Sequence, residues 1–164
     1  MIQCEVIKKR RSVRFYDANR KVGKQIILSC VEAATKAPSP LNRQPWIFRI
    51  IENHEEIQNI AAKFRYNRWI CSAPVVIIVG VENSEGLNKA KNYLAIGAAI
   101  ENLLLEAEQN NISTCWIGEC LGKGMEEMLL WPKEYEIVSM IAVGYQREYE
   151  LARPIKKSVN DVLV

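Results

Sequence analysis

The chain has a single histidine, His54, among its 164 residues, and this scarcity limits the chemistry its side chains can perform. No Ser-His-Asp or Cys-His arrangement can be defended, so we predict no catalytic side chain. A Gly-x-Gly-x-x-Gly loop is also missing, which argues against a tightly bound dinucleotide. The five cysteines are scattered, and Cys115 and Cys120 with one distant histidine make a poor zinc site. We predict no metal site and reduced thiols, with a redox-active cysteine as the open alternative.

Long hydrophobic runs and a large charge of one sign are missing as well. The longest apolar run, near residues 75–81, is too short for a bilayer and suits a buried strand. After Met1 comes a charged segment without a signal-peptide pattern, which predicts a cytoplasmic protein. The net charge is only +3, from 22 basic and 19 acidic residues, and does not favour a polyanionic partner. We therefore expect one domain over residues 1–164 with no membrane or nucleic-acid partner.

Hydrophobic periodicity predicts a mixture of helices and strands. The expected helices cover residues 3–9, 24–37, 54–64, 89–110 and 125–130, and the expected strands cover 46–51, 73–81, 112–117 and 136–145. Asn53 is a suitable N-cap for the third helix, and the strand 46–51 alternates too little to be half exposed, so we expect it to be buried. Because helices and strands do not alternate strictly, the order predicts an α+β sandwich with helices on a mostly antiparallel sheet.

Two polar segments are candidates for ligand binding. Prolines 38, 40 and 45 exclude helix and leave a rigid loop of small polar residues, which can form the wall of a site for a flat ligand. An ordinary turn is the alternative. The run Arg10–Arg14 contains three arginines and Ser12, donors that suit a single phosphate. A solvated basic face or a nucleic-acid patch is the alternative there.

The helix expected over residues 89–110 is apolar around most of its circumference. A single small domain has too little sheet to cover such a helix, so a second copy of the chain is its natural cover. Gly97 and the two alanines after it would let another backbone approach closely. Burial wholly within one subunit stays the alternative. The apolar residues within 159–164 also need a surface to cover them.

Several motifs together resemble the nitroreductase-like flavoprotein family. In chain order they are Arg10-Arg11-Ser12-Val13-Arg14, Ala37-Pro38-Ser39, Asn42-Arg43-Gln44-Pro45-Trp46, Ala73-Pro74-Val75-Val76, Glu101-Asn102-Leu103-Leu104-Leu105 and Cys115-Trp116-Ile117-Gly118. Each motif is weak alone, but their order spans nearly the whole chain. The resemblance implies a three-layer sandwich that forms an intertwined homodimer with FMN bound at its interface.

The resemblance also implies roles for individual residues. The phosphate and ribityl end of FMN would be held by Arg10, Ser12 and Arg14, with Arg11 beside them. The other subunit would supply the wall of the isoalloxazine ring, formed by Pro38, Ser39, Pro40 and Asn42. Arg68 would face the pyrimidine side of the ring, where a cation stabilises the charge that develops on reduction; a surface arginine is the alternative. The backbone of Ile117, Gly118 and Glu119 would face flavin N5, although Gly118 also suits a simple turn. Lys156, or Arg153 near it, would supply a last phosphate contact.

The implied activity is that of an FMN-dependent oxidoreductase. NADH or NADPH would bind transiently and pass hydride to flavin N5, and a small-molecule acceptor such as a nitroaromatic or quinone would follow in a ping-pong cycle. One alternative keeps the fold and the FMN but serves as a flavin sensor, a flavin-fragmenting protein or a dedicated metabolite reductase. Another, outside the family, is a nucleic-acid-binding α+β domain that uses residues 8–14 and binds with a steep salt dependence.

Overall fold

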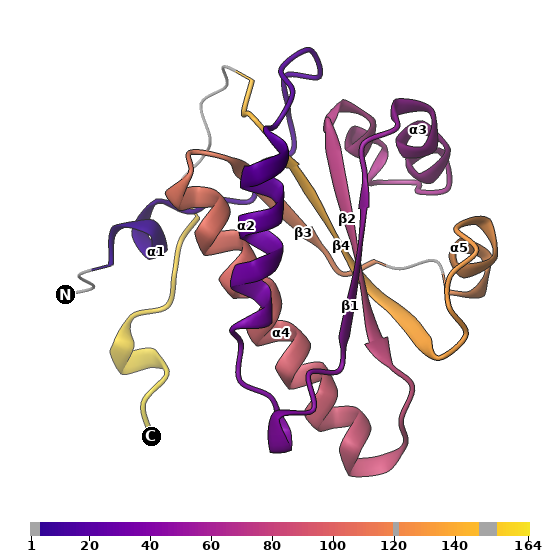
Figure 1. Cartoon of the computed structure of the whole chain (residues 1–164). Helices are drawn as coiled ribbons and strands as arrows, with labels where there is room; N and C mark the ends of the chain where they lie inside the picture. Colours follow the sequence, from indigo (N-terminus) through magenta and orange to yellow (C-terminus); the bar gives the residue numbers. More distant parts are fainter. Residues whose placement is uncertain (1–3, 120–121, 148–153) are drawn as a thin grey trace.

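Four strands form one antiparallel sheet in the order β1-β2-β4-β3 (Figure 1). The computed structural model describes residues 4–119, 122–147 and 154–164. The strands are β1 (Trp46–Ile51), β2 (Val75–Glu82), β3 (Ser113–Ile117) and β4 (Tyr135–Gly144). The helices are α1 (Glu5–Lys9), α2 (Lys24–Thr35), α3 (His54–Ala62), α4 (Gly86–Gln109) and α5 (Lys123–Met128), with short 3-10 turns η1 (Pro40–Asn42), η2 (Arg68–Ser72) and η3 (Val159–Asp161).

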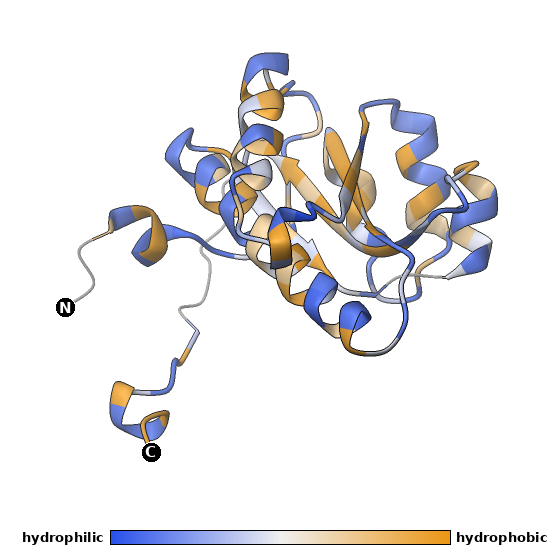
Figure 2. Ribbon diagram, turned by 60° about the horizontal axis from the view of Figure 1, so that its bottom comes forward, coloured by the Kyte–Doolittle hydropathy of each residue, from blue (hydrophilic) through white to orange (hydrophobic). Residues whose placement is uncertain are grey.

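Helices cover both faces of this sheet, and each face has its own hydrophobic cluster. Successive residues of β2 enter opposite clusters, as the two-residue period of a strand requires. Ile77 packs with α2 and α4 in one cluster, and Ile78 packs with α3, η2 and α5 in the other. Figure 2 shows the apolar residues of the helices turned towards the sheet. The α+β three-layer sandwich predicted from the sequence is therefore confirmed.

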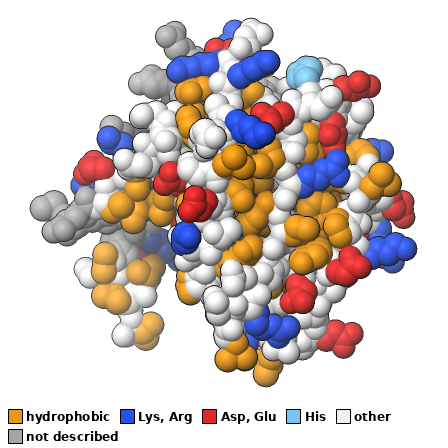
Figure 3. All heavy atoms as spheres, in the orientation of Figure 1, with side chains coloured by type: hydrophobic (Ala, Val, Ile, Leu, Met, Phe, Trp, Pro, Cys, Tyr) orange, Lys and Arg blue, Asp and Glu red, His pale blue; other side chains and the backbone are white. Residues whose placement is uncertain are grey.

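Local signals in the sequence located α3 well. Asn53 accepts a hydrogen bond from the backbone N–H of Glu56 at 3.0 Å through its side-chain oxygen, as an N-cap should. The prediction that β1 is buried was wrong, because only Ile51 of this strand is buried. Among the described strands β1 lies at the edge of the sheet and pairs with β2. Figure 3 shows hydrophobic side chains on the surface over β1.

The longest helix, α4, is only partly covered by the rest of the chain. Its inner face includes Ala99, Ile100 and Leu103, which are completely buried. On other faces Leu87 and Leu94 are 80% and 76% exposed. The helix begins three residues earlier than predicted, at Gly86, whose φ of +57° turns the chain into the helix. Within one chain, α4 thus has an apolar surface that faces solvent.

The C-terminal segment, residues 154–164, projects from the body of the molecule in both views (Figures 1 and 2). Its apolar residues Val159, Val162 and Leu163 are each at least 60% exposed. None of the described helices is both long and apolar enough to cross a lipid bilayer.

Gly80 is a point where the sheet tolerates no side chain. A Cβ atom there would lie 2.5 Å from Cζ2 of Trp131 and 2.8 Å from Cγ2 of Ile47, both closer than carbon atoms can pack. We predict that Gly80→Ala lowers the free energy of unfolding by about 1–3 kcal/mol, measured by urea denaturation. Gly124→Ala on α5 is the matched control, because its Cβ meets no atom within 4 Å. Equal stability of the two variants would contradict the close packing at Gly80.

Candidate cofactor site

The arginine run is fixed to the edge of the sheet. Arg10 ends α1, and Ser12 then forms a parallel bridge with Thr114 of β3, where the N–H of Val13 donates to the Thr114 carbonyl at 2.9 Å. The side chains of Ser12 and Arg14 are exposed, while Val13 between them is buried. The side-chain alternation of an extended segment thus buries Val13 and exposes Ser12 and Arg14.

Tyr16 anchors the same segment from below. Its ring is 3% exposed, and its hydroxyl donates to the carbonyl of Val13 at 2.6 Å and lies 3.2 Å from that of Ala142. Burial raises the pKa of Tyr16 well above its ordinary value, and the nearby Cys115 adds to the rise. Tyr16 therefore remains a protonated donor across the physiological pH range.

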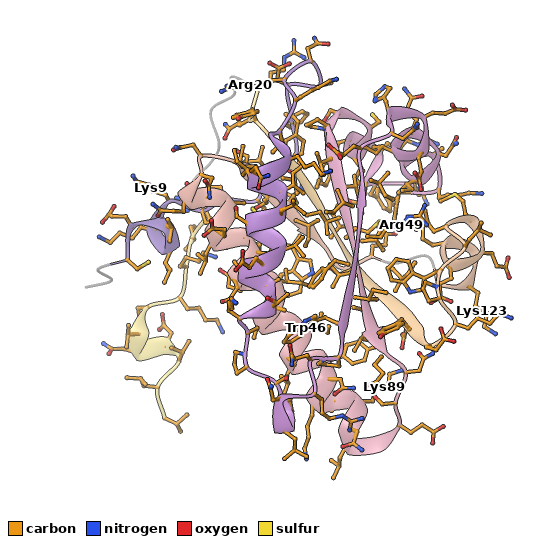
Figure 4. The ribbon with its side chains drawn as sticks, in the orientation of Figure 1. Lys9, Arg20, Trp46, Arg49, Lys89 and Lys123 are labelled. Atoms are coloured by element: carbon orange, nitrogen blue, oxygen red, sulfur yellow. The ribbon has the colours of Figure 1, made fainter. Side chains whose placement is uncertain are left out.

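Two carboxylates of α4 face the arginine run. Arg10 Nε lies 3.5 Å from Glu101 Oε1, with the arginine side chain 24% exposed. Glu108 lies two helical turns further along α4. Burial raises the pKa of Glu108, and the nearby positive charges of Lys9, Arg10 and Arg11 partly offset that rise. Lys9 lies on α1, beside the upper end of α4 in Figure 4. The positive field of the run is thus partly balanced within the chain.

The residues predicted for the ring end lie at the end of β3 and directly after it. Ile117 is buried and its carbonyl accepts a hydrogen bond from Ser139 Oγ at 3.0 Å, while Gly118 and Glu119 are exposed. Since Ser12 lies beside Thr114, Gly118 is about 13 Å further along the same strand direction. A Cβ at Gly118 would meet nothing within 4 Å, so the space in front of this backbone is open.

Arg68 begins η2, beside the turn that follows β3. Its Nε donates to the carbonyl of Phe64 at 3.3 Å. The preceding residue, Asn67, donates from Nδ2 to Glu119 Oε2 at 2.6 Å. The structure thus brings η2 together with the Gly118–Glu119 turn, although these segments are far apart in the sequence.

The loop with Pro38, Ser39, Pro40 and Asn42 lies elsewhere. It follows α2, and Figure 1 shows η1 at the lower end of the α2–α4 layer while α1 projects at the upper end. Leu41, Asn42 and Gln44 all have positive φ values, and Ser39 Oγ accepts a hydrogen bond from the Gln44 N–H at 2.9 Å. A fixed, strained loop of this kind is typical of binding sites. One chain alone does not bring it to the arginine run.

Lys156 is exposed on the C-terminal segment. Among the described residues, no ion pair or hydrogen bond joins it to the arginine run. Arg153, the alternative phosphate contact, lies outside the described residues, as does Cys120.

A groove of about 830 Å³ lies on the opposite side of the molecule, between α5 and the start of β4. Lys123 marks it in Figure 4, and Trp131 and Tyr135 line it. None of its lining residues was predicted to bind a cofactor. Nearby, Arg49 of β1 ties the outer layer together, since it donates to Glu56 at 2.8 Å and to the carbonyl of Leu129. We interpret this region as structural.

Sequence reasoning assigned no role to three residues that contact the candidate site. Asn67 joins η2 to the turn after β3, Glu101 pairs with Arg10, and Trp69 packs beside Tyr16 with ring centroids 6.4 Å apart. The seven-residue spacing of Glu101 and Glu108 on one helix was an available signal for an acidic stripe. No local pattern distinguishes Asn67 from other polar residues near a turn.

Comparison with known proteins gives consistent matches along the chain. A sequence model of the Nitroreductase family matches residues 7–65 and 59–145. A protein of Methanothermobacter thermautotrophicus, provisionally named NADH dehydrogenase/NAD(P)H nitroreductase, is 31% identical over 150 residues, which cover 88% of this chain and 77% of that protein.

Solved structures share the fold. A protein of Clostridium acetobutylicum, provisionally named NADH oxidase, has a TM-score of 0.86 at 28% identity, over 97% of this chain and 98% of the other. A nitroreductase of Bacteroides fragilis, solved with bound FMN, has a TM-score of 0.82 over 100% of this chain and 99% of the other. Its identity of 23% supports likeness of fold alone.

The buried thiols give a prediction about reactivity. Burial raises the pKa of Cys30 to about 12, with a further contribution from Glu106, and burial also raises the pKa of Cys115. At pH 8 a thiol of pKa 12 is ionised in only about one molecule in ten thousand, and the thiolate is the reactive form. We predict that an alkylating reagent leaves Cys30 and Cys115 unmodified in the folded protein, while the exposed Cys4 and Cys71 serve as the internal comparison.

Peptide mapping by mass spectrometry identifies the modified residues. Unfolding in urea should make all of these thiols reactive. Modification of folded Cys30 at the rate of Cys71 would show that the α2–α4 layer opens more readily than its packing indicates.

Proposed function

The chain belongs to the nitroreductase family, and we propose that it is an FMN-dependent oxidoreductase with NADH or NADPH as donor. The observation that supports this most is that the arginine run pairs with β3 through Ser12 and Thr114, while Gly118 and Glu119 directly follow the same strand. Phosphate donors and an open backbone for a flat ring thus lie along one line. Residues 1–164 would act as a single FMN-binding domain.

The donors present fit FMN. Arg10, Ser12 and Arg14 would hold the phosphate and ribityl end with Arg11 beside them, because guanidinium and hydroxyl groups donate to phosphate oxygens. Arg68 would place a positive charge beside the ring, and Ile117, Gly118 and Glu119 would lie against the ring through their backbone. Lys156, or Arg153 near it, would supply a last phosphate contact.

When bound, FMN would supply the redox chemistry, accepting hydride from NAD(P)H and then reducing an acceptor such as a nitroaromatic or a quinone. The chain's own contribution is binding, orientation and charge. That division suits a site in which we identify no acid, base or nucleophile among the described residues. The two substrates would use one open face in turn, which gives ping-pong kinetics.

We also propose that the active form is a homodimer. The loop with Pro38, Ser39, Pro40 and Asn42 would then complete the site of the other subunit, since it is distant from its own arginine run (Figure 1). The exposed Leu87 and Leu94 of α4 and the apolar C-terminal segment are surfaces that a second copy would cover. Interfaces of this kind bury on the order of 2,000 Å² or more.

The first test is the purified protein itself. We predict a yellow protein with one FMN per chain that oxidises NADH or NADPH and reduces a nitroaromatic, with parallel double-reciprocal lines. A colourless protein that does not bind added FMN would contradict the proposal. FMN binding without turnover would instead favour a flavin sensor, a flavin-fragmenting protein or a dedicated metabolite reductase.

Another prediction concerns the phosphate site. We expect Arg10→Ala and Arg14→Ala each to raise the Kd of FMN at least about tenfold, because each loses a charge-assisted hydrogen bond. Fluorescence titration of the apoprotein measures this. Arg20→Ala is the control, since Arg20 stacks on Tyr145 at 3.4 Å, outside the run. If the double variant Arg10→Ala/Arg14→Ala kept FMN through dialysis, the run would not be the phosphate site.

A further prediction concerns the proposed dimer interface. Leu94 is 76% exposed in one chain, so Leu94→Lys should not disturb the fold of a subunit, but a lysine in an apolar interface should dissociate the dimer. Leu130→Lys is the matched control, with a leucine 90% exposed on the layer opposite α4. Sedimentation velocity at low micromolar concentration separates the two. A Leu94→Lys variant that remains dimeric would exclude this face of α4 from the interface.

A further inference from the structure

A series of contacts connects the arginine run with the turn after β3. The N–H of Tyr16 donates to Ser72 Oγ at 3.4 Å, and this hydroxyl in turn donates to the carbonyl of Trp69 at 2.8 Å. The rings of Tyr16 and Trp69 also lie close together. Tyr16 also bonds to Val13, whose N–H donates to Thr114 of β3, so Tyr16 contacts segments from both ends of the proposed flavin site.

Asn67 is the last residue in this series of contacts. Its Oδ1 accepts from Trp69 Nε1 at 3.2 Å and its Nδ2 donates to Glu119 Oε2 at 2.6 Å. An indole nitrogen can only donate and an ionised carboxylate can only accept, so these partners fix which way the amide points. Among the described residues, this is the hydrogen bond that holds the Glu119 side chain.

We propose that Asn67 is a positioning residue for the proposed reaction. This inference rests on the proposed function, and it assigns to Asn67 the placement of the Gly118–Glu119 backbone against the flavin ring. The bond to Asn67 also keeps the charge of Glu119 on the η2 side of the turn. Reaction rates respond steeply to such placement, because a misplacement of about 1 Å costs on the order of a hundredfold.

Exchanging the donor and the acceptor of the Asn67–Glu119 hydrogen bond provides the test. Asn67→Asp keeps the acceptor for Trp69 but sets two carboxylates against each other, so kcat with NADH and a nitroaromatic should fall on the order of ten- to a hundredfold. Glu119→Gln keeps an acceptor for Asn67 and should lower kcat less than Asn67→Asp does. In Asn67→Asp/Glu119→Gln the glutamine amide donates to the aspartate, which restores both the bond and the net charge of the pair. This double variant should recover kcat to within about threefold.

Two further variants separate positioning from other effects. Asn59→Asp adds the same charge on the neighbouring α3 and should leave kcat unchanged, because Asn59 is exposed and outside the site. Glu119→Ala removes the bond at an exposed position that does not threaten the fold, and it should lower kcat at least threefold relative to Glu119→Gln. FMN affinity should change far less than kcat throughout the series.

The outcomes distinguish the inference from its premise. A wild-type protein without FMN binding or turnover contradicts the proposed function. An active wild type with equally active Asn67→Asp and Glu119→Ala variants contradicts only the role of Asn67. Loss of kcat in Asn67→Asp that the double variant does not restore, in folded and FMN-loaded protein, also overturns the positioning role.

Discussion

The hydrogen bond from Val13 to Thr114 gives the basic run a defined position at the edge of the sheet. Arginine side chains on a free N-terminal segment would sample many positions, and a bound anion would have to overcome that entropy. Here the run bridges to β3 at Ser12, Val13 and Tyr16 are buried, and Ser12 and Arg14 are exposed. Because Tyr16 also contacts η2 through Ser72 and Trp69, the same anchor positions Arg68 and Asn67. One edge of the sheet therefore organises both ends of the proposed cofactor site.

The helix α4 connects this site to the rest of the molecule. Its buried face fills the cluster between α2 and the sheet, while Glu101 and Glu108 face the arginine run. Its exposed leucines remain without cover in one chain. The helix thus combines core packing, charge balance and, in our proposal, subunit contact. A substitution on the buried face of α4 is therefore expected to affect core packing. A substitution at the exposed leucines is expected to affect subunit contact instead.

Much of the fold was predictable from local patterns. For the candidate site, the sequence indicated which residues to consider but not how they contact one another. Asn53 and the periodicity of α3 are local signals, and β2 is a β-branched run that could hardly be exposed. The partial exposure of β1 was not predictable, because whether a strand lies at an edge depends on the order of strands in the sheet. The Asn67–Glu119 bond joins residues 52 positions apart, and no sequence pattern encodes such a pairing. The arginines could be recognised individually, but not the carboxylate that faces Arg10.

That carboxylate affects how tightly an anion can bind. In the chain as described, Arg10 is three-quarters buried and paired with Glu101, so a phosphate must compete for the guanidinium or share it. A shared arginine loses little, since its five donors can serve two acceptors, and the pair holds the side chain ready in one orientation. The nearby Glu101 charge nevertheless repels a dianion, more strongly where water is excluded. Orientation of Arg10 and repulsion by Glu101 therefore act in opposite directions, and in our proposal their balance would set how firmly the site retains FMN.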